Sequence, residues 1–148
     1  MAVGKQLPKE LQTVAKEYEK RLQPHATITW KLIPASQSKN NIEVKSQESA
    51  SILSQLMPSD SVLLLDERGS QQSNIEFAKT FERLSGTQGK VVIIIGGAFG
   101  VTDELRDRAS FVWSFSELVF PHQLMRLMLL EQLYRTFMVQ IGHPYHHV

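Results

Sequence analysis

The sequence predicts an α/β fold in which a mostly parallel sheet is flanked by helices. Short apolar segments rich in β-branched residues alternate along the chain with amphipathic segments of helical length, and this order typically builds a parallel sheet. Two of the apolar segments, residues 61–65 and 91–95, are almost continuously apolar, which is typical of strands covered on both faces. Ligands of such sheets bind outside the carboxyl ends of the strands.

The first half of the chain is expected to hold two strands and two helices. The expected strands are residues 2–3 and 27–33, and the expected helices are residues 8–22 and 44–56. Gly4 and Pro34 end the strands, Pro58 stops the second helix, and the polar residues 36–41 form a loop.

The second half is expected to add three strands and three helices. The expected strands are residues 61–65, 91–95 and 110–113, and the expected helices are residues 73–84, a short helix after residue 102, and residues 121–141. Ser73 and Glu76 have the spacing of a capping box, Thr102 caps the short helix, and Pro121 suits the first turn of the last helix. The strand at 91–95 is expected to be central because nearly all its residues are β-branched.

Bulk properties set limits on the protein. At 148 residues, the chain is expected to form one domain, residues 1–148. It has no cysteine, which excludes disulfides, thiolate metal sites and cysteine nucleophiles. We expect a cytoplasmic protein with no membrane segment, because no signal peptide is visible and the apolar runs are too short to span a bilayer. The net charge of +1 lacks the basic excess of a stand-alone nucleic-acid binder, so RNA binding needs a local patch or a dimer.

Two loops at expected strand ends are candidate ligand sites. Residues 66–70, Asp-Glu-Arg-Gly-Ser, follow one buried strand, and either serve a ligand or are simply solvated. Gly96, Gly97 and Gly100 follow the central strand. They match neither a Walker loop nor a Rossmann fingerprint, so they indicate either a backbone that a ligand approaches closely or a tight strand-to-helix turn.

Residues 115–120 form an unusually apolar loop, with two aromatic and two aliphatic side chains. Such a loop either packs beneath another segment or lines an apolar pocket, and an adenine ring suits a pocket of this kind.

The helix expected after Pro121 is apolar nearly all round, which predicts burial of a second face and favours a homodimer. Glu131 and Arg135 are four residues apart and suited to pairing. His122 and Arg126 have the same spacing beside the apolar loop, and are candidates to contact an anionic substrate.

Histidines gather at the end of the chain, in His143-Pro-Tyr-His-His. No cysteine or carboxylate accompanies them, so no metal is expected, although a metal-dependent enzyme is an alternative that predicts loss of activity on chelation. Tyr145 and His146 more readily offer a stacking ring and a proton acceptor or hydrogen-bond donor. The alternative is a disordered polar end.

Taken together, these motifs resemble one family over nearly the whole chain: the ribosomal large-subunit pseudouridine N3-methyltransferases (the RlmH type) of the SPOUT, or α/β-knot, superfamily. The segments that carry the resemblance are residues 2–5, Leu65-Asp66-x-x-Gly69, Ile95-Gly96-Gly97-x-x-Gly100, residues 114–123, Arg126, Glu131-Gln132-x-Tyr134-Arg135 and Pro144-Tyr145-His146. Family members usually begin with several more residues, so the first strand is expected to be short here.

The resemblance implies a homodimer with a C-terminal deep trefoil knot that binds S-adenosylmethionine. It implies methylation of nitrogen 3 of a pseudouridine in 23S rRNA on assembled ribosomes. The cofactor contacts that it implies are Leu65, Gly96, Phe115, Ser116, Glu117, Leu118, Val119 and Phe120.

An activated methyl group needs alignment with its acceptor, and the acceptor nitrogen must lose a proton. We assign these tasks to Arg135, Tyr145 and His146, and substrate contacts to His122 and Arg126. Two alternatives remain: a SPOUT-like methyltransferase of another RNA such as tRNA, and a ribosome-associated binding module without catalysis.

Overall fold

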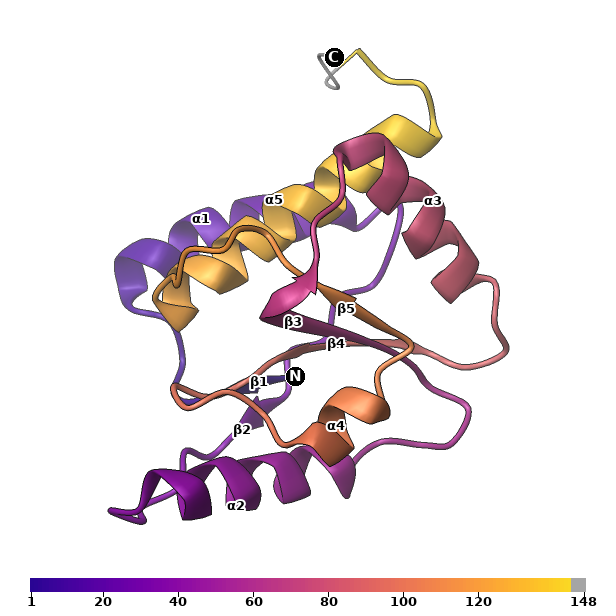
Figure 1. The fold of residues 1–148 in the computed structure, drawn as a ribbon. Helices are drawn as coiled ribbons and strands as arrows, with labels where there is room; N and C mark the ends of the chain where they lie inside the picture. Colours follow the sequence, from indigo (N-terminus) through magenta and orange to yellow (C-terminus); the bar gives the residue numbers. More distant parts are fainter. Residues whose placement is uncertain (145–148) are drawn as a thin grey trace. The chain divides into compact units, whose positions relative to one another are not determined.

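The structure, a computed structural model, describes residues 1–144 and has an α/β fold (Figure 1). The chain forms two compact units. The sheet unit comprises residues 1–6, 30–71 and 84–119, and the helical unit comprises residues 7–29, 72–83 and those from 120 onward. Within residues 1–144, no helix has both the length and the apolar content that crossing a membrane requires.

The sheet unit contains a five-stranded sheet of order β2-β1-β4-β3-β5. All its strand pairings are parallel, so the expected parallel sheet is confirmed. The strands are β1 (Ala2–Val3), β2 (Leu32–Ile33), β3 (Ser61–Ser70), β4 (Val91–Ile95) and β5 (Phe111–Trp113). The β-branched strand β4 is the middle one, as its composition predicted.

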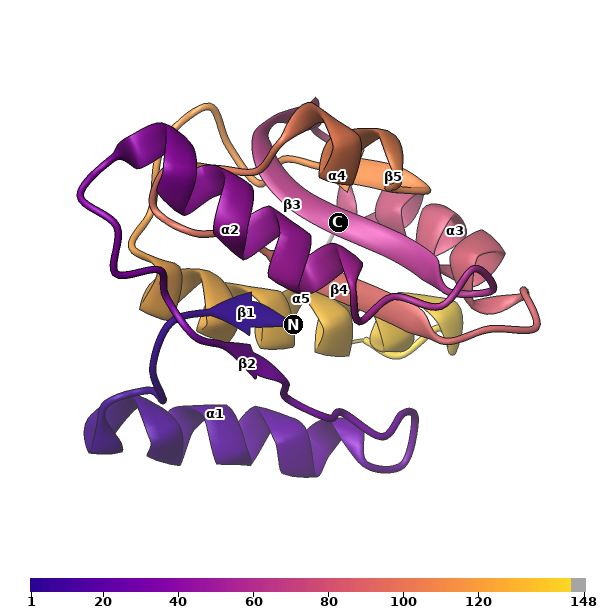
Figure 2. The same cartoon turned by 90° about the horizontal axis from the view of Figure 1, so that it is seen from below.

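Helices α2 (Asn41–Leu53) and α4 (Asp103–Asp107) cover one face of this sheet (Figure 2). The buried cluster beneath them draws on β1 to β4, on α2 and on α4: Val3, Ile33, Ile52, Val62, Leu64, Ile94, Val101 and Leu105. Each helix starts at a polar cap: the Asn40 side chain accepts from Ile42 N at 2.9 Å and Glu43 N at 3.4 Å, and the Thr102 hydroxyl accepts from Leu105 N at 3.4 Å. The caps satisfy amides that have no partner within the helix.

The helical unit contains α1 (Lys9–Leu22), α5 (His122–Gln140) and α3 (Asn74–Ser85) apart from its last two residues. Helices α1 and α5 lie side by side (Figure 1), with the Tyr18 and Tyr134 rings 6.5 Å apart. Phe137 of α5 meets the Phe81 ring of α3 edge-on at 5.7 Å and stacks on His25 at 5.5 Å. These ring contacts tie the three helices together.

Two strands differ from their expected lengths. The strand expected over residues 27–33 is confined to Leu32–Ile33, because β2 pairs only with β1, which offers two residues. Conversely, residues 66–70, expected as a loop, continue β3. The pairing is irregular there, since Leu65 and Ser70 both lie opposite Trp113, and this is how a bulged strand accommodates extra residues.

Gly69 permits this irregular pairing. A Cβ atom at position 69 would lie 2.7 Å from the carbonyl oxygen of Val112 in β5, closer than a carbon atom can approach. The strand end therefore needs glycine for close backbone approach.

The capping box expected at the start of α3 is confirmed. Glu76 Oε2 accepts hydrogen bonds from the backbone N of Ser73 at 2.8 Å and from the Ser73 hydroxyl at 2.7 Å. These two hydrogen bonds, first the hydroxyl and then the backbone one, lower the pKa of Glu76, despite a small opposing effect of desolvation. The pair reciprocally satisfies the first turn of the helix.

We expect Ser73→Ala to raise the pKa of Glu76, because the hydroxyl is the largest cause of its lowering. A carboxylate with a lowered folded-state pKa adds stability above its unfolded pKa, and this stability is lost as the pH falls through the folded value. The stability gap between wild type and variant should therefore shrink on acidification. NMR titration of the Glu76 side chain checks the shift. Lys79→Ala is the control, because Lys79 has the smallest influence on this pKa. An unchanged Glu76 titration in Ser73→Ala contradicts the assignment.

Candidate functional site

The carboxyl ends of three neighbouring strands bring the expected cofactor segments together in the sheet unit. Leu65 of β3 lies opposite Ile95 of β4 on one side and Trp113 of β5 on the other. Gly96 directly follows Ile95, and the apolar loop begins two residues after Trp113. Leu65, Gly96 and the start of the loop therefore lie at one edge of the sheet, where α/β proteins bind their ligands.

The glycine segment forms a tight turn in which Gly96 is buried and Gly97 is half-buried. Gly100 N donates to Gly97 O at 3.0 Å, and Gly100 has a φ of +74°, in the left-handed region that favours glycine. A Cβ atom at Gly96 would lie 2.8 Å from Val101 Cγ1, and one at Gly97 would lie 1.9 Å from Glu48 Oε2. Both interpretations of this segment are thus compatible with its geometry.

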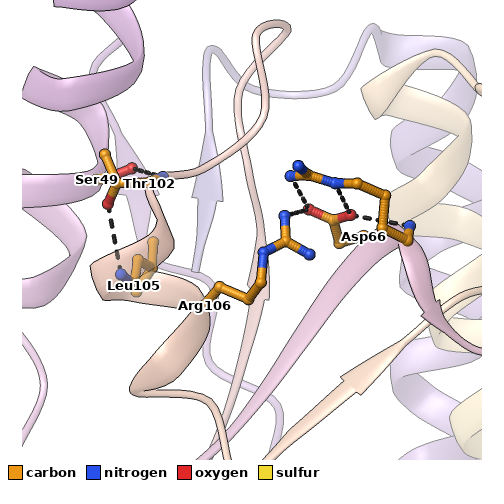
Figure 3. Close-up of polar contacts among 6 residues, drawn as sticks. Ser49, Asp66, Thr102, Leu105 and Arg106 are labelled. Carbon is orange, nitrogen blue, oxygen red and sulfur yellow. Dashed lines mark hydrogen bonds and ion pairs between the residues drawn. The ribbon is translucent and has the colours of Figure 1, made fainter.

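Asp66, at the same edge, is the centre of a buried ion-pair cluster (Figure 3). Its Oδ2 accepts from Arg106 of α4 at 2.8 Å, and its carboxylate also accepts from the Arg68 guanidinium at 3.1 and 3.2 Å. The Arg68 backbone N adds a fourth hydrogen bond at 2.9 Å. Because these four bonds use the acceptor capacity of the carboxylate, Asp66 fastens the end of β3 to α4.

Sequence reasoning missed Arg106, which lies forty residues beyond Asp66 along the chain. Only its position in the first helix after the glycine segment could have suggested it. The three charges expected in one loop also separate: Asp66 is buried, Glu67 is exposed, and the Arg68 side chain is 52% exposed.

The apolar loop divides into a packed half and an exposed half. The Phe115 ring packs edge-on against Trp113 with centroids 4.4 Å apart. The Ser114 hydroxyl donates to Ser116 O at 2.9 Å. By contrast, Leu118 is 69% and Val119 is 84% exposed, so the loop presents two aliphatic side chains to solvent. Neighbouring exposed aliphatic residues on a structured loop are typical of a ligand or partner surface.

The remaining described candidates belong to the helical unit. Phe120 precedes α5, His122 is its first residue, and Arg126 is only 4% exposed. Burial lowers the pKa of Arg126, because desolvation disfavours the charged guanidinium. Arginine is rarely this buried unless it is paired.

Arg135 forms the ion pair that its spacing predicted. Its guanidinium donates to Glu131 Oε1 at 2.6 and 3.0 Å, and both side chains are largely buried. At 1.5 Å per residue, Arg135 lies about 13 Å further along α5 than Arg126, so the two guanidiniums serve different positions along the helix.

Tyr145 and His146 lie outside the described residues. Among residues 1–144, no group of three or more histidines and carboxylates is placed to hold a metal ion. Helix α5 ends in a left-handed turn at Gly142 with φ of +67°, and His143 N donates to Met138 O at 2.9 Å, the closing pattern of a Schellman motif.

Sequence comparisons agree with this geometry. Residues 1–146 match the model of a family described as "Predicted SPOUT methyltransferase". The chain belongs to the SPOUT methyltransferase family. The match spans the segments of both the sheet unit and the helical unit.

Curated relatives carry one name, "Ribosomal RNA large subunit methyltransferase H". Those from Desulfitobacterium hafniense and Lactobacillus delbrueckii subsp. bulgaricus are 41% and 37% identical to this chain over 154 aligned residues, which cover 99% of this chain and 96% of each relative. The relative from Gloeobacter violaceus is 35% identical, with the same coverage. Their near-complete coverage places the SPOUT resemblance over the whole chain.

We expect Asp66→Ala to lower the free energy of unfolding by about 2–3 kcal/mol, because it removes the acceptor of charge-assisted hydrogen bonds from two guanidiniums. Arg106→Ala should cost more than Arg68→Ala, since the Arg106 side chain is 21% exposed and that of Arg68 is 52% exposed. Urea unfolding measures all three values.

The control is Glu67→Ala, which removes the neighbouring exposed carboxylate and should change stability by less than about 0.5 kcal/mol. Equal losses of unfolding free energy for Asp66→Ala and Glu67→Ala would show that the ion pairs of Asp66 do not fasten the end of β3 to α4.

Proposed function

We propose that this protein is an S-adenosylmethionine-dependent rRNA (pseudouridine-N3-)-methyltransferase that acts on 23S rRNA in assembled ribosomes in the cytoplasm. The observation that carries the proposal is the meeting of Leu65, Gly96 and the apolar loop at the ends of three adjacent parallel strands. Membership of the SPOUT family supports methyl transfer. The shared name of the curated relatives supports ribosomal RNA of the large subunit as the substrate.

The residues at this edge fit such a cofactor. The segment after β4 carries no side chain at Gly96, Gly97 and Gly100, which suits a close backbone approach, and the exposed aliphatic side chains of Leu118 and Val119 suit an adenine ring. Leu65, Gly96 and residues 115–120 would hold the cofactor. When bound, it supplies a methyl group that is already activated on a sulfonium.

We further propose that residues 1–148 act as one SPOUT domain with a C-terminal deep trefoil knot, and that the domain works as a homodimer. Support for the dimer comes from apolar residues that stay accessible on and after α5: Leu124 is 43% and Ile141 is 58% exposed. A self-complementary apolar surface is the usual basis of a two-fold dimer. No bound metal is required by this chemistry.

The chain's own groups must place the RNA and manage one proton. Arg135 is held by Glu131, and its role in this proposal is to stabilise the negative charge that develops when the acceptor nitrogen loses its proton. Tyr145 and His146 are the proposed groups for proton handling. His122 and Arg126 are the proposed contacts to the RNA, some distance along α5 from Arg135.

The proposal is tested by methyl transfer from labelled S-adenosylmethionine to ribosomes that lack the native modification, with stripped rRNA and bulk tRNA in parallel. We expect label on ribosomes only, mapped to nitrogen 3 of a pseudouridine. Label on tRNA would support S-adenosylmethionine as the cofactor and would show that the substrate is tRNA and not 23S rRNA. Cofactor binding without transfer to any RNA would identify a catalytically silent module.

We expect Arg135→Ala to lower kcat on ribosomes by at least about tenfold, as loss of a charge-stabilising donor does in other enzymes. The dissociation constant for the cofactor should stay within about twofold, because its proposed contacts lie elsewhere. Initial rates at saturating cofactor and calorimetric titration measure the two quantities.

The matched control is Arg21→Ala, which breaks an ion pair of the same spacing with Glu17 on α1. This control should retain wild-type kcat. If Arg135→Ala also retains it, Arg135 has no part in catalysis.

A further inference from the structure

Glu48 of α2 is a buried carboxylate that the proposed function does not use. The residue is 5% exposed and belongs to the sheet unit. Its Oε1 accepts a hydrogen bond from the backbone N of Ser36 at 3.0 Å. Its Oε2 is also buried, and no donor among the described residues reaches it. Burial of a carboxylate oxygen without a donor is unfavourable, so packing alone does not account for a glutamate here.

The second oxygen lies against the glycine turn. A Cβ atom at Gly97 would lie 1.9 Å from Glu48 Oε2 and 3.0 Å from its Cδ, so the carboxylate occupies the space that any side chain at position 97 would need. Glu48 and Gly97 are complementary: the absence of a side chain on one allows the other to enter.

The contact spans the ends of two strands. Ser36 follows β2 and Gly97 follows β4, and these strands flank β1 on its two sides. One carboxylate therefore reaches across the end of β1, from the segment after β2 to the turn after β4. An aspartate or an apolar side chain cannot combine this length with an acceptor for the Ser36 amide.

The next residue of α2 holds the other end of the same turn. The Ser49 hydroxyl accepts from Thr102 N at 3.0 Å (Figure 3), and Ser49 is 1% exposed. Glu48 and Ser49 thus contact the turn at Gly97 and at Thr102, on either side of Gly100. Helix α2 therefore holds the glycine turn in place through two consecutive residues.

We propose that Glu48 is a positioning residue that sets cofactor affinity through Gly97 and takes no part in methyl transfer. The inference rests on the proposed function, because it takes Gly96 as a cofactor contact. Glu48 keeps the backbone of the turn in the arrangement that receives the cofactor. Removal of the Glu48 side chain weakens cofactor binding. It does not change how the methyl group of the bound cofactor is aligned, because other residues set that alignment.

The test compares Glu48→Ala with Glu48→Gln by calorimetric titration with S-adenosylmethionine and by initial rates on unmodified ribosomes. Glu48→Ala should raise the dissociation constant and the KM for the cofactor by about tenfold, with kcat at saturating cofactor within about twofold. Glu48→Gln keeps the side-chain length and an acceptor for Ser36, so it should restore affinity to within about threefold of wild type.

The control is Gln47→Ala, which removes the exposed neighbour that accepts from the Ser36 hydroxyl at 2.6 Å and does not touch the glycine turn. It should bind cofactor like wild type. Gly97→Ala places a methyl group in the space that the Glu48 carboxylate occupies. This substitution should therefore raise the dissociation constant for the cofactor as much as Glu48→Ala does. All variants are assayed at a temperature where thermal unfolding shows them to be folded.

Unchanged affinity in Glu48→Ala overturns the inference, as does a fall in kcat at saturating cofactor with affinity retained, or a loss in Glu48→Gln as large as in Glu48→Ala. If Glu48→Ala does not fold, Glu48→Asp and Gly97→Ala take its place. Each should raise the dissociation constant for the cofactor while kcat at saturating cofactor stays within about twofold, and unchanged affinity in both overturns the inference. Failure of the wild-type protein to bind the cofactor overturns the proposed function itself, whereas wild-type binding and transfer with unaffected Glu48 variants overturns this inference alone.

Discussion

The parallel pairing of β3 with β4 on one side and β5 on the other is the constraint on which the candidate site depends. Leu65 faces both neighbours in register, and this register decides which residues emerge together at the carboxyl edge. A shift of one residue in either pairing would reverse the faces of a strand and separate Gly96 from the apolar loop. The nearly complete burial of the first six residues of β3 makes such a shift unfavourable.

The edge is held by polar groups that are themselves buried. Asp66 links β3 to α4 through Arg106, while α2 contacts the glycine turn through two consecutive residues, Glu48 and Ser49. Stability and site geometry are therefore coupled: the residues that fasten α2 and α4 to the sheet also shape the turn that a ligand would meet. Low-dielectric surroundings make such contacts specific, because an unpaired partner is costly.

Local patterns predicted most of the fold. The β-branched run at 91–95 predicted the central strand, and the Ser73–Glu76 spacing predicted a capping box that the structure contains. Features that depend on a partner distant in sequence were missed. The length of β2 is set by β1, and the continuation of β3 is set by β5. Arg106, which pairs with Asp66, and Glu48, which lies against Gly97, both come from other elements. For the candidate site, the sequence predicted that the segments after residues 65, 95 and 113 lie at one edge of the sheet; it did not show that Arg126 is buried or that Glu48 lies against the glycine turn.

The place of β1 has a consequence for the order of assembly during translation. Ala2 pairs with Ile95, and the amino group of Met1 donates to Ile93 O at 2.6 Å, so the first strand needs a partner that is made more than ninety residues later. At elongation rates of about 5–20 residues per second, β1 has only β2 to pair with for several seconds of synthesis. Such distant pairing favours late closure of the sheet. The nascent chain can therefore complete the β1–β4 junction of the sheet only after β4 has left the ribosome.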